Sequence, residues 1–302
     1  FYGTLSHTTG RPRPVAQYMS ARNSLVRMLE LEHGFRVVDL STRLPSTGGG
    51  TPPQGHTITA DRLERELHQA GITKAVVFPP SAPETSYVAP NNGVARRSVD
   101  RPFVAVARIN GTQTAGQKTT GRLRNAVSRR DDHHTTPSDI EKYAYDDRFH
   151  GFVLDPTVDD YPDDDVLTAL EDVNLPVIVR GGTDAPPETL TETLLERSFP
   201  IIVGHFGGHP LNRSLMDRMI DLLAEYDDCY LETSFVRYRD HLERALLEHP
   251  DRVFFGSGAP ACHPNVAVME ILTLDVSEDL LRRAFSKNAC RVIDALGPSV
   301  EP

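Results

Sequence analysis

Polar residues that could do chemistry stand at the ends of short apolar runs along the chain. Ser41 and Arg43 come directly after one such run, and Asp39 lies within its last two residues. Guanidinium groups bind carboxylate or phosphate through paired hydrogen bonds, and histidine moves protons near neutral pH. The ends of the other runs carry comparable residues, namely Arg108, Asp155, Arg180, His205, His209, Glu232, Ser234 and Ser257. If these ends lie side by side, they would form an anion-binding site with a proton-transferring histidine.

The apolar runs have the length and composition of strands. They are rich in β-branched residues, hardly alternate with polar ones and have helical patterns between most of them, which is typical of parallel strands covered by helices. The runs occupy residues 35–40, 74–79, 103–109, 150–155, 175–180, 199–205, 229–234 and 252–257. The sequence therefore predicts a single (β/α)8 TIM barrel, whose chemistry lies where the strands end. An open doubly wound sheet is disfavoured, because no glycine-rich phosphate turn follows the first run.

Three segments are assigned outside the regular strand–helix alternation. Residues 1–34 are expected to be an N-terminal helical extension, and residues 35–302 form the barrel. The polar stretch 110–148 is expected to contain an insertion, and the proline-containing stretch 79–92 a lid over the barrel mouth. The helical patterns between the runs cover residues 60–71, 163–173, 211–226, 237–249, 263–273 and 277–296.

Composition excludes several classes of protein. With 42 acidic against 32 basic residues, the net charge of −10 makes nucleic acid a poor partner. No apolar run approaches the ~18–20 residues of a membrane span. The chain shows no signal-peptide pattern at its start, and its three cysteines, Cys229, Cys262 and Cys290, are odd in number and widely spaced. These features predict a cytoplasmic protein with reduced thiols. The low lysine content fits either a high-salt environment or a GC-rich genome.

Several sequence blocks, in order, resemble one known family. FRVVDLSTRLP, HGFVLDP, LPVIVRGG, FPIIVGHFGG, CYLETS and RVFFGSGAP, followed by the closing SEDLLRRAFSKNACRVI, are similar to the amidohydrolase-related barrels, a group of metal-dependent hydrolases and decarboxylases. The resemblance spans about residues 35 to 296. It implies a TIM barrel and, because such barrels often pair through their outer helices, a homo-oligomer.

The resemblance also implies that the metal centre of the family is altered here. In that family, an Asp-x-His-x-His motif ends the first strand, and its two histidines fall on Ser41 and Arg43 of this chain. The fifth-strand histidine falls on Arg180 and the eighth-strand aspartate on Gly258, whereas the sixth-strand histidine is kept as His205. Serine is a poor zinc ligand and arginine is a permanent cation. We therefore expect this chain to hold no metal at these positions.

The first functional hypothesis is a site for a small carboxylate-bearing molecule, in either a metal-independent hydrolase or lyase or a non-catalytic barrel. Arg43 and Arg180 would grip the anion, and His205 would transfer the proton, with Ser41 and Asp39 beside it. The remaining substrate-binding candidates are Arg108, Asp155, Glu232 and Ser257.

Two alternatives stay open. One is a structural or partner-binding pseudoenzyme, in which the strand-end arginines only pair with neighbouring acids. The other is a metal-dependent hydrolase with a rebuilt site for zinc or another divalent ion. Its candidate ligands are His205, His209, Glu232, Cys262 and His263. The cluster Asp131–His134 in the polar stretch is interpreted as solvated surface.

Overall fold

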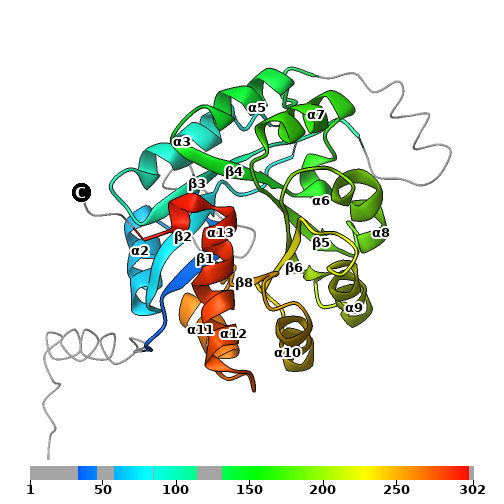
Figure 1. Ribbon diagram of the computed structural model, residues 1–302. Helices are drawn as coiled ribbons and strands as arrows, with labels where there is room; N and C mark the ends of the chain where they lie inside the picture. Colours follow the sequence, from blue (N-terminus) through cyan, green and yellow to red (C-terminus); the bar gives the residue numbers. More distant parts are fainter. Residues whose placement is uncertain (1–32, 46–57, 84, 114–130, 299–302) are drawn as a thin grey trace, which may run out of the picture.

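Eight parallel strands form the centre of the fold (Figure 1). The computed structural model describes residues 33–45, 58–83, 85–113 and 131–298. The strands pair in chain order and are β1 (Val37–Arg43), β2 (Ile72–Phe78), β3 (Phe103–Arg108), β4 (Phe149–Leu154), β5 (Val177–Gly182), β6 (Ile201–His209), β7 (Cys229–Glu232) and β8 (Val253–Phe254). Backbone hydrogen bonds from Leu40 to Phe255 and from Arg43 to Ala259 join β1 to the chain after β8. The predicted (β/α)8 TIM barrel is confirmed.

Helices surround this barrel on its outside (Figure 1). Each of the six predicted helical patterns forms a helix, and five of these helices begin at a residue whose side chain accepts a backbone hydrogen bond, as where the Asp163 side chain accepts from the Val166 amide. The helices are α2 (Ala60–Gln69), α3 (Val88–Ser98), α5 (Pro137–Ala144), α6 (Pro156–Asp159), α7 (Asp164–Val173), α8 (Pro187–Leu190), η1 (Thr191–Leu195), α9 (Arg213–Leu222), α10 (Arg239–Glu248), α11 (Pro264–Leu272), α12 (Glu278–Arg282), η2 (Arg283–Lys287), α13 (Asn288–Val292) and η3 (Asp294–Leu296).

The stretch predicted to be a lid is partly helical. Its last residues belong to the first turn of α3, and Pro90 is tolerated there because first-turn amides have no partner within the helix. The polar stretch 110–148 likewise contains α5, which begins with a capping box between Thr136 and Asp139. Residues 114–130 of that stretch, and residues 1–32 of the predicted N-terminal extension, lie outside the described residues.

The barrel interior is filled by one apolar cluster, and a larger cluster lies between the strands and the helices. Residues near the C-terminus complete the interior cluster, where Ala289, Ile293 and Leu296 join the strand side chains. The Lys74 ammonium donates to the carbonyl of Ala295 at 2.9 Å and holds this segment beneath the start of β2. Within the described part of the chain, no helix is both long and apolar enough to span a membrane.

Candidate active site

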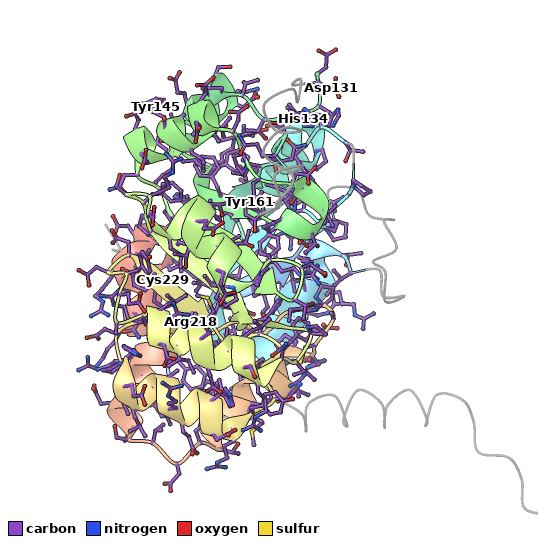
Figure 2. All side chains as sticks on the ribbon, turned by 90° about the vertical axis from the view of Figure 1, so that its right-hand side faces the viewer. Asp131, His134, Tyr145, Tyr161, Arg218 and Cys229 are labelled. Carbon is purple, nitrogen blue, oxygen red and sulfur yellow. The ribbon has the colours of Figure 1, made fainter. Side chains whose placement is uncertain are left out.

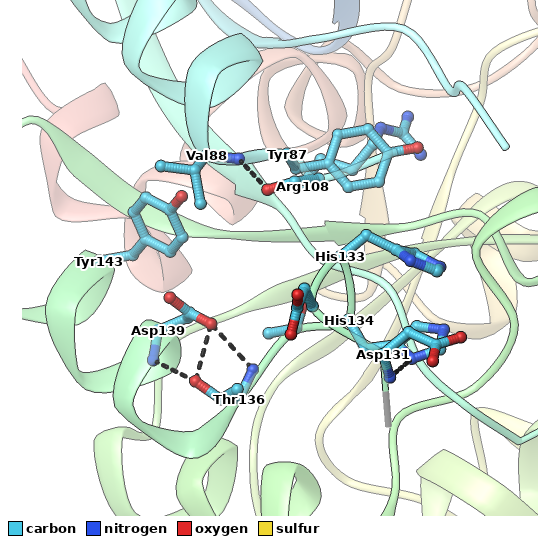
Figure 3. Close-up of a pocket in the computed structure, with 12 residues that line it drawn as sticks. Tyr87, Val88, Arg108, Asp131, His133, His134, Thr136, Asp139 and Tyr143 are labelled. Carbon is cyan, nitrogen blue, oxygen red and sulfur yellow. Dashed lines mark hydrogen bonds between the residues drawn. The ribbon is translucent and has the colours of Figure 1, made fainter. Parts of the chain in front are cut away.

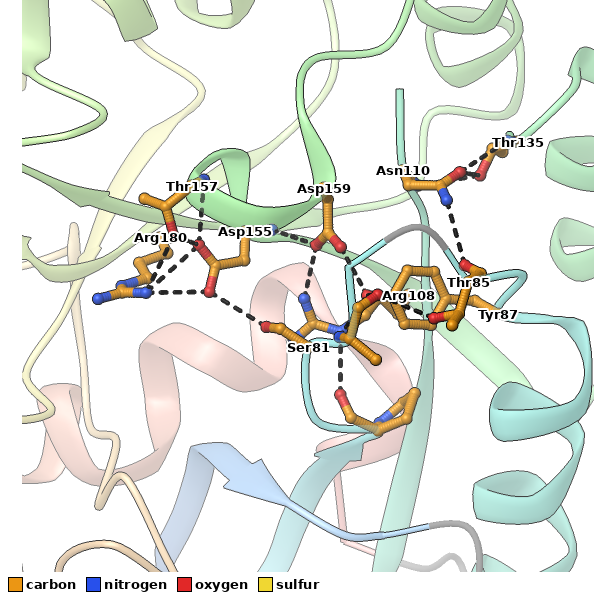
Figure 4. Close-up of polar contacts among 12 residues, drawn as sticks. Ser81, Thr85, Tyr87, Arg108, Asn110, Thr135, Asp155, Thr157, Asp159 and Arg180 are labelled. Atoms are coloured by element: carbon orange, nitrogen blue, oxygen red, sulfur yellow. Dashed lines mark hydrogen bonds and ion pairs between the residues drawn. The ribbon is translucent and has the colours of Figure 1, made fainter. Parts of the chain in front are cut away.

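A buried ion pair lies at the ends of β3 and β4 (Figure 4). Arg108 Nη1 is 2.7 Å from Asp159 Oδ2, and both side chains are 1% exposed. The Tyr87 hydroxyl donates to the other oxygen of Asp159 at 2.6 Å, and Arg108 Nε donates to the Pro79 carbonyl at 2.9 Å. These contacts compensate the Arg108 charge, and its predicted substrate-binding role stays a prediction.

A second ion pair joins β5 to the end of β4 (Figure 4). Arg180 Nη1 is 3.1 Å from Asp155 Oδ2, and Arg180 Nη2 is 2.9 Å from His209 Nδ1. The same Nη2 is 3.3 Å from His209 Nε2, and because a guanidinium can only donate, the His209 ring accepts through a bare nitrogen and is neutral. Burial lowers the pKa of His209, and the Arg180 charge lowers it further. Burial opposes ionisation of Asp155, yet the charge of Arg180 and the hydrogen bond from Thr157 bring the pKa of that carboxyl below its usual value.

Arg43, at the end of β1, differs from the other two arginines. Its half-buried guanidinium has no hydrogen-bond or ion-pair partner among the described residues. Burial lowers its pKa, and the charges that act on it are chiefly those of Arg108, Asp155 and Arg180. Arg43 therefore lies among the paired charges of the mouth without being paired itself.

Two buried carboxyl groups each accept hydrogen bonds from a serine. Asp39 accepts from the backbone amide and the hydroxyl of Ser257 and from the amide of Ser41 at 3.0 Å. Burial raises the pKa of Asp39. Glu232 accepts from the amide of Ser234 and, at 2.7 Å, from its hydroxyl. Burial raises the pKa of Glu232 to about 8.

Gly256 makes room for the Glu232 carboxyl. A Cβ at position 256 would lie 1.7 Å from Glu232 Oε1, so that no side chain fits while the carboxyl keeps this place. The glycine of the RVFFGS block is therefore explained by a close approach across neighbouring strands.

His205 lies on β6 beside these groups and is 6% exposed. Its Nδ1 is 2.7 Å from Ser234 Oγ and 3.0 Å from the Ser234 carbonyl oxygen. Burial lowers the pKa of His205 to about 3. His205 and Phe206 both have positive φ, 59° and 49°, which costs about 1–3 kcal/mol per non-glycine residue. The backbone thus holds the imidazole in place at some conformational cost.

The structure brings most predicted site residues together. Ser41 Oγ is 3.5 Å from Ser234 Oγ and so bridges the Asp39 and Glu232 groups. Ser257 is fully buried against Asp39. Ser81, Tyr87 and Thr157, which the sequence did not single out, hold the named residues by hydrogen bonds.

The residues suggested for a rebuilt metal site do not converge. No three of them place their ligand atoms within 4.8 Å of one another in the described chain. Cys262 accepts a long contact from Arg237, and His263 caps α11 by accepting from the Asn265 amide. At the positions where the related barrels carry metal ligands, Ser41, Arg43 and Arg180 offer no zinc-type donor. These three side chains therefore do not suit such a metal as ligands.

The one group of three potential metal ligands in the described residues is Asp131, His133 and His134, at the rim above β3 (Figures 2 and 3). Their ligand atoms all lie within 4.8 Å of one another. The group borders two cavities of about 340 and 720 Å³. Asp131 is exposed, as expected for solvated surface, but the two histidines are half-buried. His134 Nδ1 already accepts from the Asp131 amide at 2.8 Å.

Comparison with known proteins identifies the family of this barrel. The sequence pattern of the Amidohydrolase family matches residues 78–294, and the chain belongs to that family. No curated protein matches the sequence.

Solved structures of low sequence identity share the fold. An uncharacterised TIM-barrel protein from Bordetella bronchiseptica aligns with a TM-score of 0.62 at 18% identity, over 87% of this chain and 100% of that one. A 2,6-dihydroxybenzoate decarboxylase from Rhizobium aligns with a TM-score of 0.58 at 15% identity, over 87% and 100%. A 5-carboxyvanillate decarboxylase from Novosphingobium aromaticivorans with bound manganese and a nitrobenzoic acid aligns with a TM-score of 0.60 at 13% identity, over 85% and 97%. At these identities, the similarities establish the fold alone.

Proposed function

We propose that the mouth binds a small carboxylate-bearing molecule, with Arg43 as its anchor and His205 as its proton acceptor, in a metal-independent lyase or hydrolase. The observation that carries this proposal is the Arg43 guanidinium, which is half-buried and has no partner among the described residues. Keeping such a cation partly out of water is costly unless an anion joins it.

The charges of the mouth favour a monoanion. Arg108 pairs with Asp159, and Arg180 pairs with Asp155. Arg43 is the arginine that has no ion-pair partner among the described residues. The buried Glu232 carboxyl does not offset that charge well, because burial raises its pKa to about 8. One carboxylate would neutralise Arg43, and the planar guanidinium suits its two oxygens.

Relatives suggest the chemical class of the molecule. The decarboxylases from Rhizobium and Novosphingobium aromaticivorans act on hydroxylated benzoic acids, as their names state. An aromatic monocarboxylate is therefore the first ligand to test. His205 would take or return a proton at such a molecule, while Arg43 and Arg180 hold the carboxylate beside it.

Thermal unfolding with added anions tests the proposal. Benzoate or 2,6-dihydroxybenzoate at a hundred times its Kd is expected to stabilise the protein by about 2.7 kcal/mol, and Arg43→Gln to abolish that gain. Arg43→Gln should not destabilise the ligand-free protein, because it removes a charge that has no partner. The control Arg62→Gln, in an exposed pair on α2, should respond to the anions like wild type.

A stabilisation that persists in Arg43→Gln would contradict the site. No stabilisation by any carboxylate or by phosphate would favour the other class of function, a structural or partner-binding pseudoenzyme. The expected homo-oligomeric state and cytoplasmic location also remain proposals, of which sedimentation analysis tests the first.

A metal-dependent reaction is the second candidate, because Asp131, His133 and His134 can offer three ligands beside the two cavities. Elemental analysis of protein prepared with manganese or zinc separates the candidates. Stoichiometric metal that is lost in a His133→Ala/His134→Ala variant, but kept in His205→Asn, would support a rim site. Stoichiometric metal that is lost in His205→Asn would overturn the metal-free mouth. If the metal-independent proposal is correct, the metal content should be the same in wild type and in His205→Asn.

A further inference from the structure

Among the described residues, Ser234, just beyond the end of β7, is the hydrogen-bond partner of the His205 imidazole. Its hydroxyl lies 2.7 Å from His205 Nδ1 and 2.7 Å from Glu232 Oε2. Its carbonyl oxygen lies 3.0 Å from the same imidazole nitrogen. Ser234 itself is held through its backbone amide, which donates to the other oxygen of Glu232.

These contacts decide where the imidazole proton sits. A carbonyl oxygen can only accept, so the contact between His205 Nδ1 and the Ser234 carbonyl requires a proton on Nδ1. The Ser234 hydroxyl can accept from the same N–H while it donates its own proton to Glu232. A neutral imidazole carries only one ring proton, so Nε2 is left bare.

His205 Nε2 is open to the mouth. It has no hydrogen-bond partner in the described part of the chain, and it is not among the buried atoms left without one. The imidazole ring lies beside that of His209, with centroids 5.2 Å apart, and the charges of Arg43 and Arg180 act on it. A bare ring nitrogen therefore stands next to the groups proposed to hold the carboxylate.

We propose that Ser234 is a positioning residue that holds His205 in the Nδ1–H tautomer and so presents Nε2 as the proton acceptor of the site. Glu232 contributes by fixing the amide and hydroxyl of Ser234. This inference rests on the proposed function for the use made of Nε2, but the tautomer itself belongs to the ligand-free protein.

The tautomer is measured by two-bond ¹H–¹⁵N correlation spectra of the full chain labelled with ¹⁵N-histidine, at pH 7 and without ligand. His205→Asn assigns the signal. The wild-type spectrum is expected to show Nδ1 protonated and Nε2 bare. In Ser234→Ala, the carbonyl remains as the only acceptor, so the tautomer ratio should move by about fivefold toward Nε2–H, the form that free histidine prefers.

Ser257→Ala is the matched control, because Ser257 is also buried and bonded to a strand-end carboxyl but, within the described chain, is not a hydrogen-bond partner of His205. It should leave the His205 signal unchanged. A wild-type protein with Nε2–H, or a ratio in folded Ser234→Ala equal to that of wild type, would overturn the proposal. If Ser234→Ala does not fold, the wild-type spectrum alone decides.

The outcome is separate from that of the anion experiment. Carboxylate binding that depends on Arg43, together with an Nε2–H tautomer, would sink the role of Ser234 and leave the anion site standing. The expected tautomer without any carboxylate binding would sink the proposed function and leave the positioning by Ser234 intact.

Discussion

Replacing Asp159 with asparagine is expected to lower the free energy of unfolding by about 3–5 kcal/mol, because it breaks a fully buried ion pair. The carboxylate is 1% exposed and lies 2.7 Å from an equally buried guanidinium. Asparagine keeps the shape but removes the charge, so Arg108 would stay in the interior as an uncompensated cation. The midpoint and slope of urea unfolding measure the change.

Two further variants make this prediction specific. Asp164→Asn breaks an exposed pair with Arg197 and should cost less than about 1 kcal/mol. Combining Asp159→Leu with Arg108→Met removes both buried charges and should recover much of the loss. A loss below about 1 kcal/mol in Asp159→Asn would show that water reaches this pair and that the mouth is more open in solution than the burial of the two side chains implies.

The second large effect concerns the acid sensitivity contributed by His205. Burial lowers its pKa to about 3, whereas an unfolded chain has a value near 6.5. As the pH falls below about 6.5, the unfolded state takes up a proton that the folded state does not. His205 therefore costs nothing above that pH and destabilises the fold increasingly down to about pH 3, by about 2 kcal/mol at pH 5.

The measurement compares wild type with His205→Asn, since asparagine tolerates the positive φ at this position. The difference in unfolding free energy between the two proteins should move by about 2 kcal/mol in favour of the variant from pH 7 to pH 5. Glu232 acts in the opposite sense, because its raised pKa makes stability fall as the pH rises through about 4.5 to 8, but it does so in both proteins. His68→Asn, on the exposed face of α2, is the control. A pH-independent difference would mean that His205 has the same pKa in the folded and in the unfolded protein.

The order of elements was predictable because it depends on local patterns. Continuous apolar runs identified the strands, and each of the six helical patterns between them contains a helix. The helix α3 was missed because its sequence, VAPNNGVARRS, combines a proline, a glycine and two asparagines, all of which favour turns. Packing of Val94 and Ala95 on the barrel outweighs those local preferences.

The residues of the site were predictable from their positions at strand ends, but their hydrogen-bond and ion-pair partners were not. Closure of the barrel gathers Arg43, Arg180 and His205, and the sequence placed each of them at a strand end. It could not show that Arg108 is compensated by Asp159, because the choice of partner depends on side-chain direction across two strands. Ser234 was identified only as a polar residue at a strand end, because its contact with His205 comes from the fold around it.

The way the interior cluster is completed has a consequence for synthesis of the chain. Ile293 and Leu296 lie against side chains from the first strands of the barrel, more than two hundred residues earlier. When all eight strands of a nascent chain have left the ribosome but this segment has not, water still contacts the interior side chains that Ile293 and Leu296 will cover. The interior cluster can therefore be completed only after this segment has been synthesised, and until then its apolar side chains stay exposed and favour aggregation.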